Sequence, residues 1–130
     1  MKTLRSPLGR VLGYGPAKEG AVSHWWVQRL TSIALIPLTL WFVCSLLFLP
    51  SLDYATVAAW LSGNGTALLM ILLILTATRH SQLGIQVVIE DYVHAHGVKT
   101  LSLVIVTFTH VLVAAAATFA VLKVAFGGVQ

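Results

Sequence analysis

Three long apolar stretches constrain this chain more than any other feature of its sequence. They cover residues 25–50, 66–89 and 101–126, and each is close to or above the roughly 20 residues that an α-helix needs to cross a bilayer core. Backbone polar groups in lipid must be hydrogen-bonded within their own segment, so helices are expected. Charged residues make up only 9% of the chain, against about 25% in soluble domains. We therefore predict an all-α integral membrane protein with three transmembrane helices, in a single domain of residues 1–130.

The basic residues predict how these helices are oriented. Four of them lie in the N-terminal arm, residues 1–24: Lys2, Arg5, Arg10 and Lys18. The first connection has no Lys or Arg, whereas Lys99 lies in the second, and cytoplasmic segments carry an excess of basic residues. The N-terminus is therefore expected in the cytoplasm and the C-terminus outside, although Lys123 gives a weaker opposing signal. The glycine-rich segment 6–20 is expected to be extended, on the membrane surface or on a partner.

Composition also excludes several classes of protein. The only cysteine, Cys44, lies inside the first apolar stretch, so the chain forms no internal disulfide, cysteine-ligated metal cluster or c-type haem attachment. We expect Cys44 to be a buried, unreactive thiol. The net charge of +4 comes from scattered basic residues, which does not indicate nucleic-acid binding. No glycine fingerprint for a nucleotide cofactor is present.

The second apolar stretch carries the densest set of polar residues: Arg79, His80, Gln82, Gln86, Glu90, Asp91 and Tyr92. Polar groups within a membrane span are costly, so each is a candidate for function. His80 lies about 18 Å from Tyr92 along a helix that rises 1.5 Å per residue, which places it near the middle of the bilayer. A neutral imidazole at that depth can ligate haem iron. Gly84 follows at i+4 on the same face and leaves room for a flat macrocycle, but a histidine bonded to a neighbouring helix is the alternative.

Two arginines pose similar questions. Arg79 requires a carboxylate, a haem propionate or a hydrated cavity, and an acidic group on another chain is the alternative. Arg29 belongs to a polar and aromatic cluster with His24 and Trp25 at the start of the first stretch. We expect Arg29 to be level with Asp91, facing a haem propionate, a quinone headgroup or a lipid phosphate.

Three further histidines complete the set of candidates. His110, in the third stretch, lies about 16 Å past Lys99 by helical rise, so its depth is expected to match that of His80. It is either a second ligand to the same haem or a hydrogen-bonded packing residue. His94 and His96 are expected to be solvated in the second connection.

Much of the chain resembles the small membrane-anchor (D-type) subunit of succinate dehydrogenase, respiratory complex II. The similarity rests on residues 80–94, with the spacing His-x3-Gly-x6-Asp-Tyr, and on residues 6–10, 17–20, 24–31 and 34–38 of the N-terminal third. It covers nearly the whole chain, including the order of the three helices. The spacing is specific because it joins a mid-membrane ligand to a polar pair at the interface.

This resemblance implies roles for the matched residues. His80 matches the axial ligand of haem b, whose second ligand comes from a larger cytochrome b anchor subunit. Tyr92 matches a tyrosine that hydrogen-bonds a ubiquinone carbonyl, with Asp91 as its companion. Arg29 matches an arginine near the haem propionates and the quinone pocket, and His24 matches approximately. Arg79 and His110 are not part of the family motif.

The resemblance implies the anchor subunit of a bacterial succinate:ubiquinone oxidoreductase in the inner membrane. Such a subunit attaches the flavoprotein and iron–sulfur subunits to the lipid bilayer, while this chain contains no succinate-oxidising site of its own. The expected cofactor is haem b, shared with the larger anchor, and ubiquinone is the substrate. Two alternatives remain: an anchor of fumarate reductase or another quinone-linked cytochrome b, and a structural or assembly subunit without a cofactor.

Overall fold

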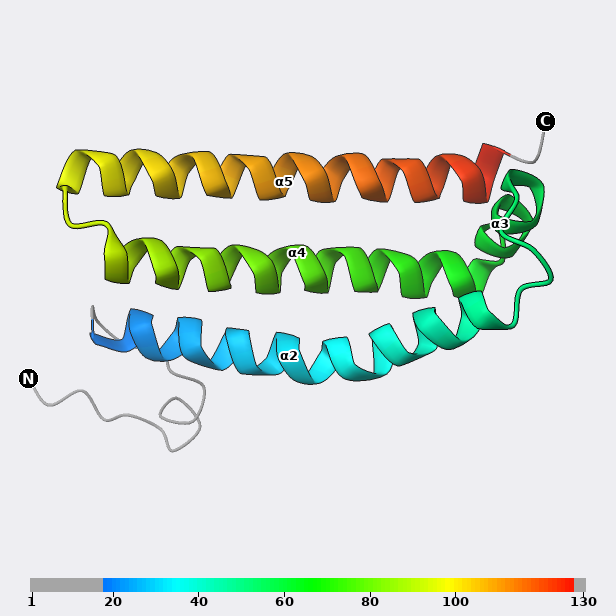
Figure 1. The fold of residues 1–130 in the computed structure, drawn as a ribbon, viewed down its shortest axis with the longest axis horizontal. Helices are drawn as coiled ribbons and strands as arrows, with labels where there is room; N and C mark the ends of the chain where they lie inside the picture. The colour runs from blue at the N-terminus through cyan, green and yellow to red at the C-terminus, as the bar shows by residue number, and fades with distance from the viewer. Residues whose placement is uncertain (1–17, 128–130) are drawn as a thin grey trace, which may run out of the picture.

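The structure is a computed structural model that describes residues 18–127, with side chains from His24 onward. Its helices are α2 (Lys18–Leu47), α3 (Tyr54–Leu61), α4 (Asn64–Tyr92) and α5 (His96–Gly127) (Figure 1). Among the described residues, α4, α5 and the His24–Leu47 part of α2 are long and apolar enough to cross a membrane. The predicted all-α membrane class with three spanning helices is therefore confirmed.

Each long helix has more residues than its predicted apolar stretch, although α2 ends at Leu47, three residues before the predicted end at residue 50. α2 begins at Lys18, so Lys18–Gly20, which we expected to be extended, is helical; residues 1–17 lie outside the described part of the chain. The second connection is only residues 93–95, so Lys99 belongs to the first turn of α5 and donates from Nζ to the Glu90 carbonyl at 2.9 Å. Apolar composition marks only the part of a helix that lies in hydrocarbon, and helices continue into polar residues beyond it.

The short helix α3 was not predicted, because its eight residues are too few to span a membrane. Asp53 caps it: its carboxylate accepts from the backbone N–H of Thr56 at 2.9 Å and from the Ser51 and Thr56 hydroxyls. These hydrogen bonds lower the pKa of Asp53 from 3.8 to about 2, and the hydrogen bond from Ser51 makes the largest contribution to this shift. Trp60 on α3 stacks on Trp41 of α2 with ring centroids 5.9 Å apart, which holds the connection against the bundle.

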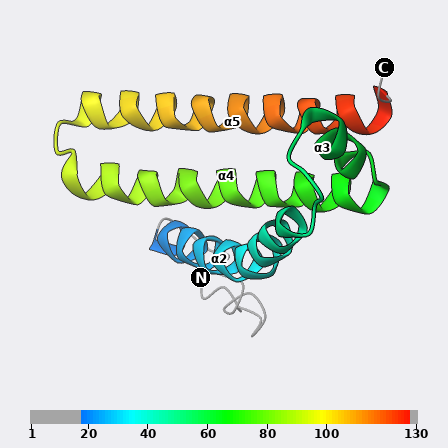
Figure 2. The same ribbon diagram turned by 45° about the vertical axis from the view of Figure 1, so that its right-hand side comes forward.

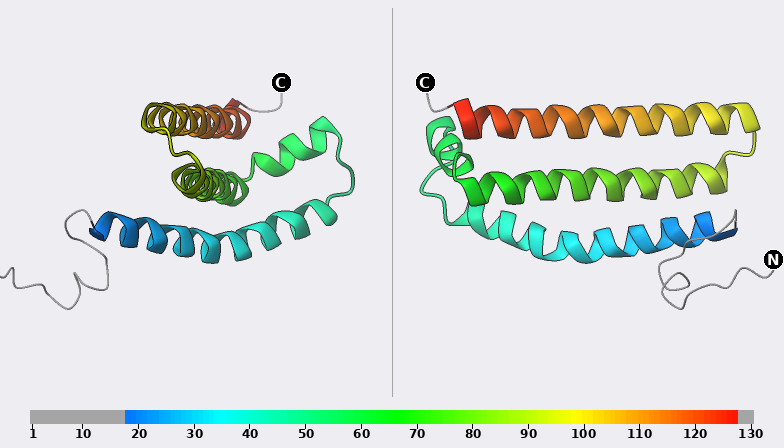
Figure 3. Two further views of the ribbon diagram at one scale, coloured as in Figure 1. Left: turned by 60° about the vertical axis from the view of Figure 1, so that its left-hand side comes forward. Right: turned by 180° about the vertical axis from the view of Figure 1, so that it is seen from behind.

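α4 is the central element of the described structure. It packs against α2 on one side and α5 on the other, and α2 and α5 do not contact each other. The axes of α4 and α5 are nearly parallel, and the two helices run in opposite chain directions. α2 instead crosses α4 obliquely (Figures 2 and 3). α2 is also visibly curved (Figure 1) and contains Pro37, which lacks the N–H needed for one helical hydrogen bond. Pro37 therefore gives a physical reason for the curvature of α2.

The ends of the helices agree with three membrane crossings. The start of α2 and the α4–α5 connection lie at one end of the bundle, while α3 and the end of α5 lie at the other (Figure 1). Lys18 and Lys99 therefore belong to the same end, as the charge pattern requires. The side of the membrane on which each end lies stays a prediction.

Few side chains are buried within the chain itself. The buried described residues are Ala58, Ala67, Leu83 and Val121, and all are apolar. Large apolar side chains are exposed along every long helix, which suits a lipid or protein partner but not water. Cys44 is exposed on α2, so the expectation that it is buried is wrong for the isolated chain: the apolar stretch around it faces outward as well as inward.

Candidate functional site

His80 lies where α2 crosses α4, and two polar side chains of α2 contact its ring. The Thr31 hydroxyl oxygen is 3.0 Å from Nδ1 of His80. The Gln28 side-chain amide nitrogen is 3.5 Å from Nε2. The imidazole is half-buried, and its position near the middle of α4 agrees with the depth predicted from the sequence.

The hydrogen bonds of Thr31 favour one of the two ring nitrogens of His80 as the carrier of the proton. A hydroxyl has a single hydrogen. Thr31 donates this hydrogen toward its own helix, where the Val27 carbonyl oxygen lies at 2.8 Å and the Gln28 carbonyl oxygen at 3.0 Å. Thr31 therefore accepts from His80, and Nδ1 carries the hydrogen. Nε2 is left with its lone pair, which is the form of imidazole that ligates a metal.

Gln28 and Gly84 form the rest of this site. The Gln28 side-chain oxygen is buried and has no hydrogen-bond partner among the described residues. A Cβ added to Gly84 would lie 3.6 Å from the Gln28 amide nitrogen, with no other neighbour within 4 Å. Gly84 therefore shares a face with His80, as the i+4 spacing predicts, and its missing side chain leaves room beside the ring.

The structure corrects the predicted level of Arg29. Its neighbour Gln28 contacts His80 and Gly84, and Asp91 lies seven residues beyond Gly84, about 10 Å along α4. The prediction failed because the level of Arg29 depends on how α2 is aligned against α4, which the sequence does not give. Its guanidinium carbon is 4.1 Å above the centre of the Trp25 ring, a cation–π contact.

His24 and the interfacial residues lie apart from His80. His24 is exposed on α2, next to Trp25 and Trp26, whose rings meet edge to face at 5.1 Å. Asp91 and Tyr92 are exposed in the last turn of α4, and Tyr92 retains 78% of its accessible surface. His94 and His96 are exposed as expected, although His96 begins α5. The chain alone does not bring Asp91 or Tyr92 to His80.

His110 matches the depth of His80 but faces different groups. Its Nδ1 donates to the Val106 carbonyl at 2.8 Å, which leaves Nε2 to accept from the Ser81 hydroxyl at 3.3 Å. Ser81 follows His80 in the chain, so the expected match in depth is confirmed. His80 instead contacts α2, so the two imidazole rings have separate partners. No group of three or more metal-ligating side chains occurs among the described residues.

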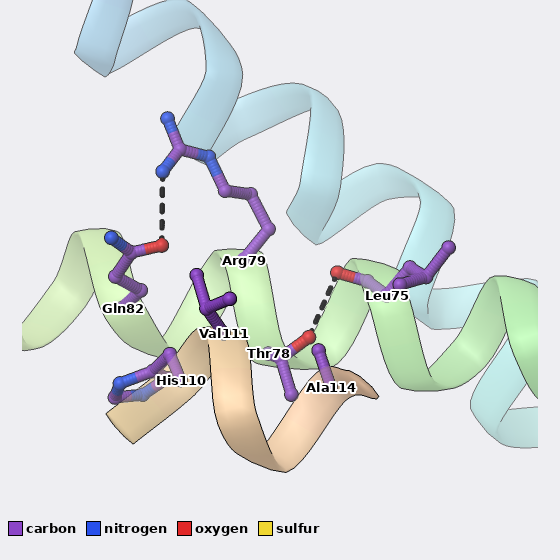
Figure 4. A pocket seen from close by; sticks show the side chains of 7 residues that line it. All are labelled: Leu75, Thr78, Arg79, Gln82, His110, Val111 and Ala114. Atoms are coloured by element: carbon purple, nitrogen blue, oxygen red, sulfur yellow. Dashed lines mark hydrogen bonds between the residues drawn. The ribbon is translucent and has the colours of Figure 1, made fainter. Parts of the chain in front are cut away.

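Arg79 also faces away from the His80 site. It lines a pocket of about 180 Å³ with Gln82 of α4 and His110 of α5, among others, and these side chains are drawn in Figure 4. Its Nη1 donates to the Gln82 side-chain oxygen at 3.0 Å, and the Gln82 amide donates to the Thr107 hydroxyl at 3.2 Å.

Our sequence reasoning missed the contacts of Gln28 and Thr31 with His80. A signal was available, because both are polar residues inside a span and lie three positions apart, on one helix face. What the sequence does not give is the register between α2 and α4, and this register decides which polar residues meet His80.

The fold and the site together define a multi-spanning membrane protein with a polar, imidazole-containing site between two of its helices. The family described as succinate dehydrogenase/fumarate reductase transmembrane subunit matches residues 2–122. The succinate dehydrogenase hydrophobic membrane anchor subunit of Rickettsia bellii is 28% identical over 83% of this chain and 86% of its own length. The corresponding subunit of Rickettsia conorii is 30% identical over 71% of this chain and 73% of its own length. The succinate dehydrogenase membrane anchor subunit of Reclinomonas americana is 26% identical over 75% of this chain and 82% of its own length. No solved structure gives a significant match.

The chain therefore belongs to the family of succinate dehydrogenase/fumarate reductase transmembrane subunits, and it is a membrane-anchor subunit of succinate dehydrogenase. It is thus part of an oxidoreductase complex. The resemblance inferred from the spacing around His80 is confirmed.

Proposed function

We propose that this subunit supplies one axial ligand, His80 Nε2, to a haem b shared with a larger anchor subunit, and that it forms part of a ubiquinone site at Tyr92. The observation that carries the proposal is the hydrogen bond between Thr31 and His80 Nδ1 at 3.0 Å. It directs the proton to Nδ1 and keeps the lone pair of Nε2 for iron. When bound, the haem would take up and release one electron at a time.

The residues around His80 fit such a group. The side-chain oxygen of Gln28 is buried and has no hydrogen-bond partner among the described residues, so it marks a site that these residues do not complete. Gly84 leaves space on the same face of α4. The Gln28 amide contacts Nε2, so this nitrogen becomes free for iron only when the amide moves aside. A contact of 3.5 Å is at the long limit for a hydrogen bond, so little is lost when it breaks.

The quinone part of the proposal rests on the end of α4. A quinone headgroup is amphipathic and suits the membrane border, and the phenol of Tyr92 is a neutral donor that can bond a carbonyl. Asp91 would orient a basic partner or pass on protons. Arg29 and His24 are proposed to help bind the propionates or the headgroup from α2, where the cation–π contact with Trp25 holds the Arg29 guanidinium.

The same proposal includes the partners and the location. The chain has no group for oxidising succinate, so flavoprotein and iron–sulfur subunits would do this in the cytoplasm and pass electrons to the quinone at the inner membrane of a bacterium. The family description also names fumarate reductase, and an anchor of that enzyme is the second candidate. The curated relatives described above are all succinate dehydrogenase subunits, which favours succinate oxidation.

A reduced-minus-oxidised optical spectrum of the purified complex tests the haem assignment. We expect a low-spin b-type spectrum in the wild type, loss or change of that spectrum in His80→Ala, and an unchanged spectrum in His110→Ala. A spectrum lost in His110→Ala but not in His80→Ala would show that the wrong histidine was chosen. If the wild-type complex contains no haem, the chain is a structural subunit.

A further inference from the structure

A line of polar side chains follows the face of α4 that does not carry His80. We call Arg79, Gln82, Gln86 and Glu90 the polar stripe. At 100° per residue these four positions fall within roughly 80° of arc, and His80 is turned about 100° from Arg79. Hydrogen bonds join the stripe internally, from Arg79 to Gln82 at 3.0 Å and from Gln86 to Glu90 at 2.8 Å. The stripe thus runs from near the middle of α4 to its end.

The charge of Arg79 is not compensated by the described part of the chain. Arg79 is exposed, and its single described hydrogen bond uses one of the five N–H donors of a guanidinium. The acidic residues with described side chains are Asp53, Glu90 and Asp91. Glu90 and Asp91 lie about 16 to 18 Å further along α4, and Asp53 lies in the connection before α3. An arginine left in this state would face hydrocarbon at high cost.

A hollow next to Arg79 gives a second reason to expect a neighbour. The pocket of about 180 Å³ there lies between α4 and α5 and is bordered by the short side chains of Thr78 and Ala114. Figure 4 shows the Arg79 side chain reaching along this face toward Gln82, with His110 coming from α5. Small residues at such positions let another helix approach closely in a membrane.

We infer that the polar stripe is the surface on which a transmembrane helix of the partner membrane subunit packs, and that this helix carries an Asp or Glu at the depth of Arg79. The positive charge decides the chemistry of the partner group, because the carboxylate of Asp or Glu is the protein side-chain group that satisfies both the charge and the fork of N–H donors. A haem propionate is a less suitable source, since Arg79 and His80 point from different faces of α4. The inference rests on the proposed function only in requiring a second membrane subunit.

The first experiment removes the charge within the complete complex. Arg79→Gln keeps a polar side chain but cannot form an ion pair. We expect the partner membrane subunit recovered with the tagged chain after detergent extraction to fall roughly three- to tenfold, the effect of one interhelical polar interaction in a membrane. Lys123→Gln removes the same charge from an exposed position of α5 and should leave recovery unchanged.

The second experiment uses the wild-type stripe and therefore does not depend on how the variant folds. A photo-reactive amino acid replaces Leu75, which is exposed beside Arg79 and lines the same pocket. Another replaces Val88, which is exposed and about 80° of turn from His80 on the side away from the stripe. We expect Leu75 to cross-link to a partner transmembrane peptide that contains Asp or Glu, and Val88 not to reach that peptide.

The outcomes separate this inference from the proposed function. If the wild-type chain is purified without a second membrane subunit, the proposed function fails. If the partner is present but Arg79→Gln retains it fully, or Leu75 cross-links only to lipid, the inference alone is wrong. A loss of haem in Arg79→Gln with full retention of the partner would assign Arg79 to a propionate and also overturn it. In a charge exchange, Arg79→Glu is combined with a basic residue in place of the partner carboxylate. Restored assembly of this pair would support the inference directly.

Discussion

The Thr31 hydroxyl oxygen on α2 lies 3.0 Å from His80 Nδ1 on α4, and this contact links the helix that begins the bundle to the proposed haem ligand. Because Thr31 also donates to the Val27 carbonyl at 2.8 Å, its hydroxyl is held in place by its own helix. The ring of His80 is thus oriented by a group that the helix backbone itself fixes. A metal-ligating histidine is commonly supported in this way, through its second nitrogen.

Thr31→Val tests this support, because it removes the hydroxyl and keeps the shape of the side chain. Loss of a hydrogen bond to Nδ1–H makes the imidazole a weaker donor to iron, so the haem midpoint potential should rise. A hydrogen bond of about 0.5–1.5 kcal/mol corresponds to roughly 20–65 mV for a one-electron couple. Potentiometric titration of the complex measures the shift.

Two controls accompany this substitution. Thr31→Ser retains the hydroxyl and should restore most of the wild-type potential. Ser32→Ala removes the neighbouring hydroxyl, which donates to the Gln28 carbonyl and not to His80, and should cause no shift. Equal potentials in Thr31→Val and the wild type would show that Thr31 does not orient the ligand.

Gly84 allows a graded test of the space beside His80. An added Cβ would make only an ordinary contact of 3.6 Å with the Gln28 amide, so Gly84→Ala should retain most of the haem. Gly84→Leu fills the space between α4 and α2, and overpacking of about 1–3 kcal/mol predicts a roughly five- to hundredfold loss of haem affinity. The haem content of purified complexes checks both. Gly97→Leu adds the same side chain where a Cβ has no neighbour within 4 Å, and an equal loss of haem there would contradict the explanation.

The number of spanning helices and the depth of His80 were predictable from the sequence, because each depends on local composition and helical rise. The i+4 relation of Gly84 to His80 was predictable for the same reason. The level of Arg29 was not, because it depends on how α2 is aligned against α4. The contacts of Thr31 and Gln28 depend on how α2 crosses α4, which no spacing within one helix determines.

The helix α3 shows a different limit of sequence reasoning. Its eight residues (Tyr54–Leu61) are too few to span a membrane, so an analysis based on spanning length overlooks them. A local signal was available, because Asp53 is a favoured N-cap residue at the start of this helix. Its side chain accepts from the backbone N–H of Thr56, three residues later. The stacking of Trp60 on Trp41 depends on the chain folding back, which the sequence alone does not reveal.

The Asp53 cap predicts a pH dependence of α3. Because hydrogen bonds lower the folded-state pKa of Asp53 from 3.8 to about 2, its contribution is complete above about pH 4 and is lost as the pH falls through about 2. We expect the amides of residues 54–61 to exchange faster in Asp53→Ala at neutral pH, and in the wild type only near pH 2. Hydrogen–deuterium exchange of the complex, corrected for intrinsic rates, measures this. Asp53→Asn retains a capping side chain, and exchange as fast as in Asp53→Ala would argue against the cap.

Tyr92 provides the test that distinguishes a subunit taking part in quinone reduction from a simple anchor. Its side chain is 78% exposed at the end of α4, so the loss of its hydroxyl should not disturb this fold. Tyr92→Phe removes only a hydrogen bond of about 0.5–1.5 kcal/mol, which predicts a roughly two- to tenfold loss of quinone-dependent turnover. Succinate oxidation with an artificial acceptor that takes electrons before the quinone should remain near normal.

Tyr54 offers a matched control for this experiment. It is exposed to the same extent, 78%, but it begins α3 at the opposite end of the bundle (Figure 1), where the proposal places no quinone. Tyr54→Phe should therefore change neither assay, since it removes the same hydroxyl from an equally exposed ring. Equal loss of both activities in Tyr92→Phe would indicate faulty assembly, because the artificial acceptor does not use the quinone site. Unchanged quinone reduction in Tyr92→Phe would remove this tyrosine from the site and leave the chain as an anchor at that end of α4.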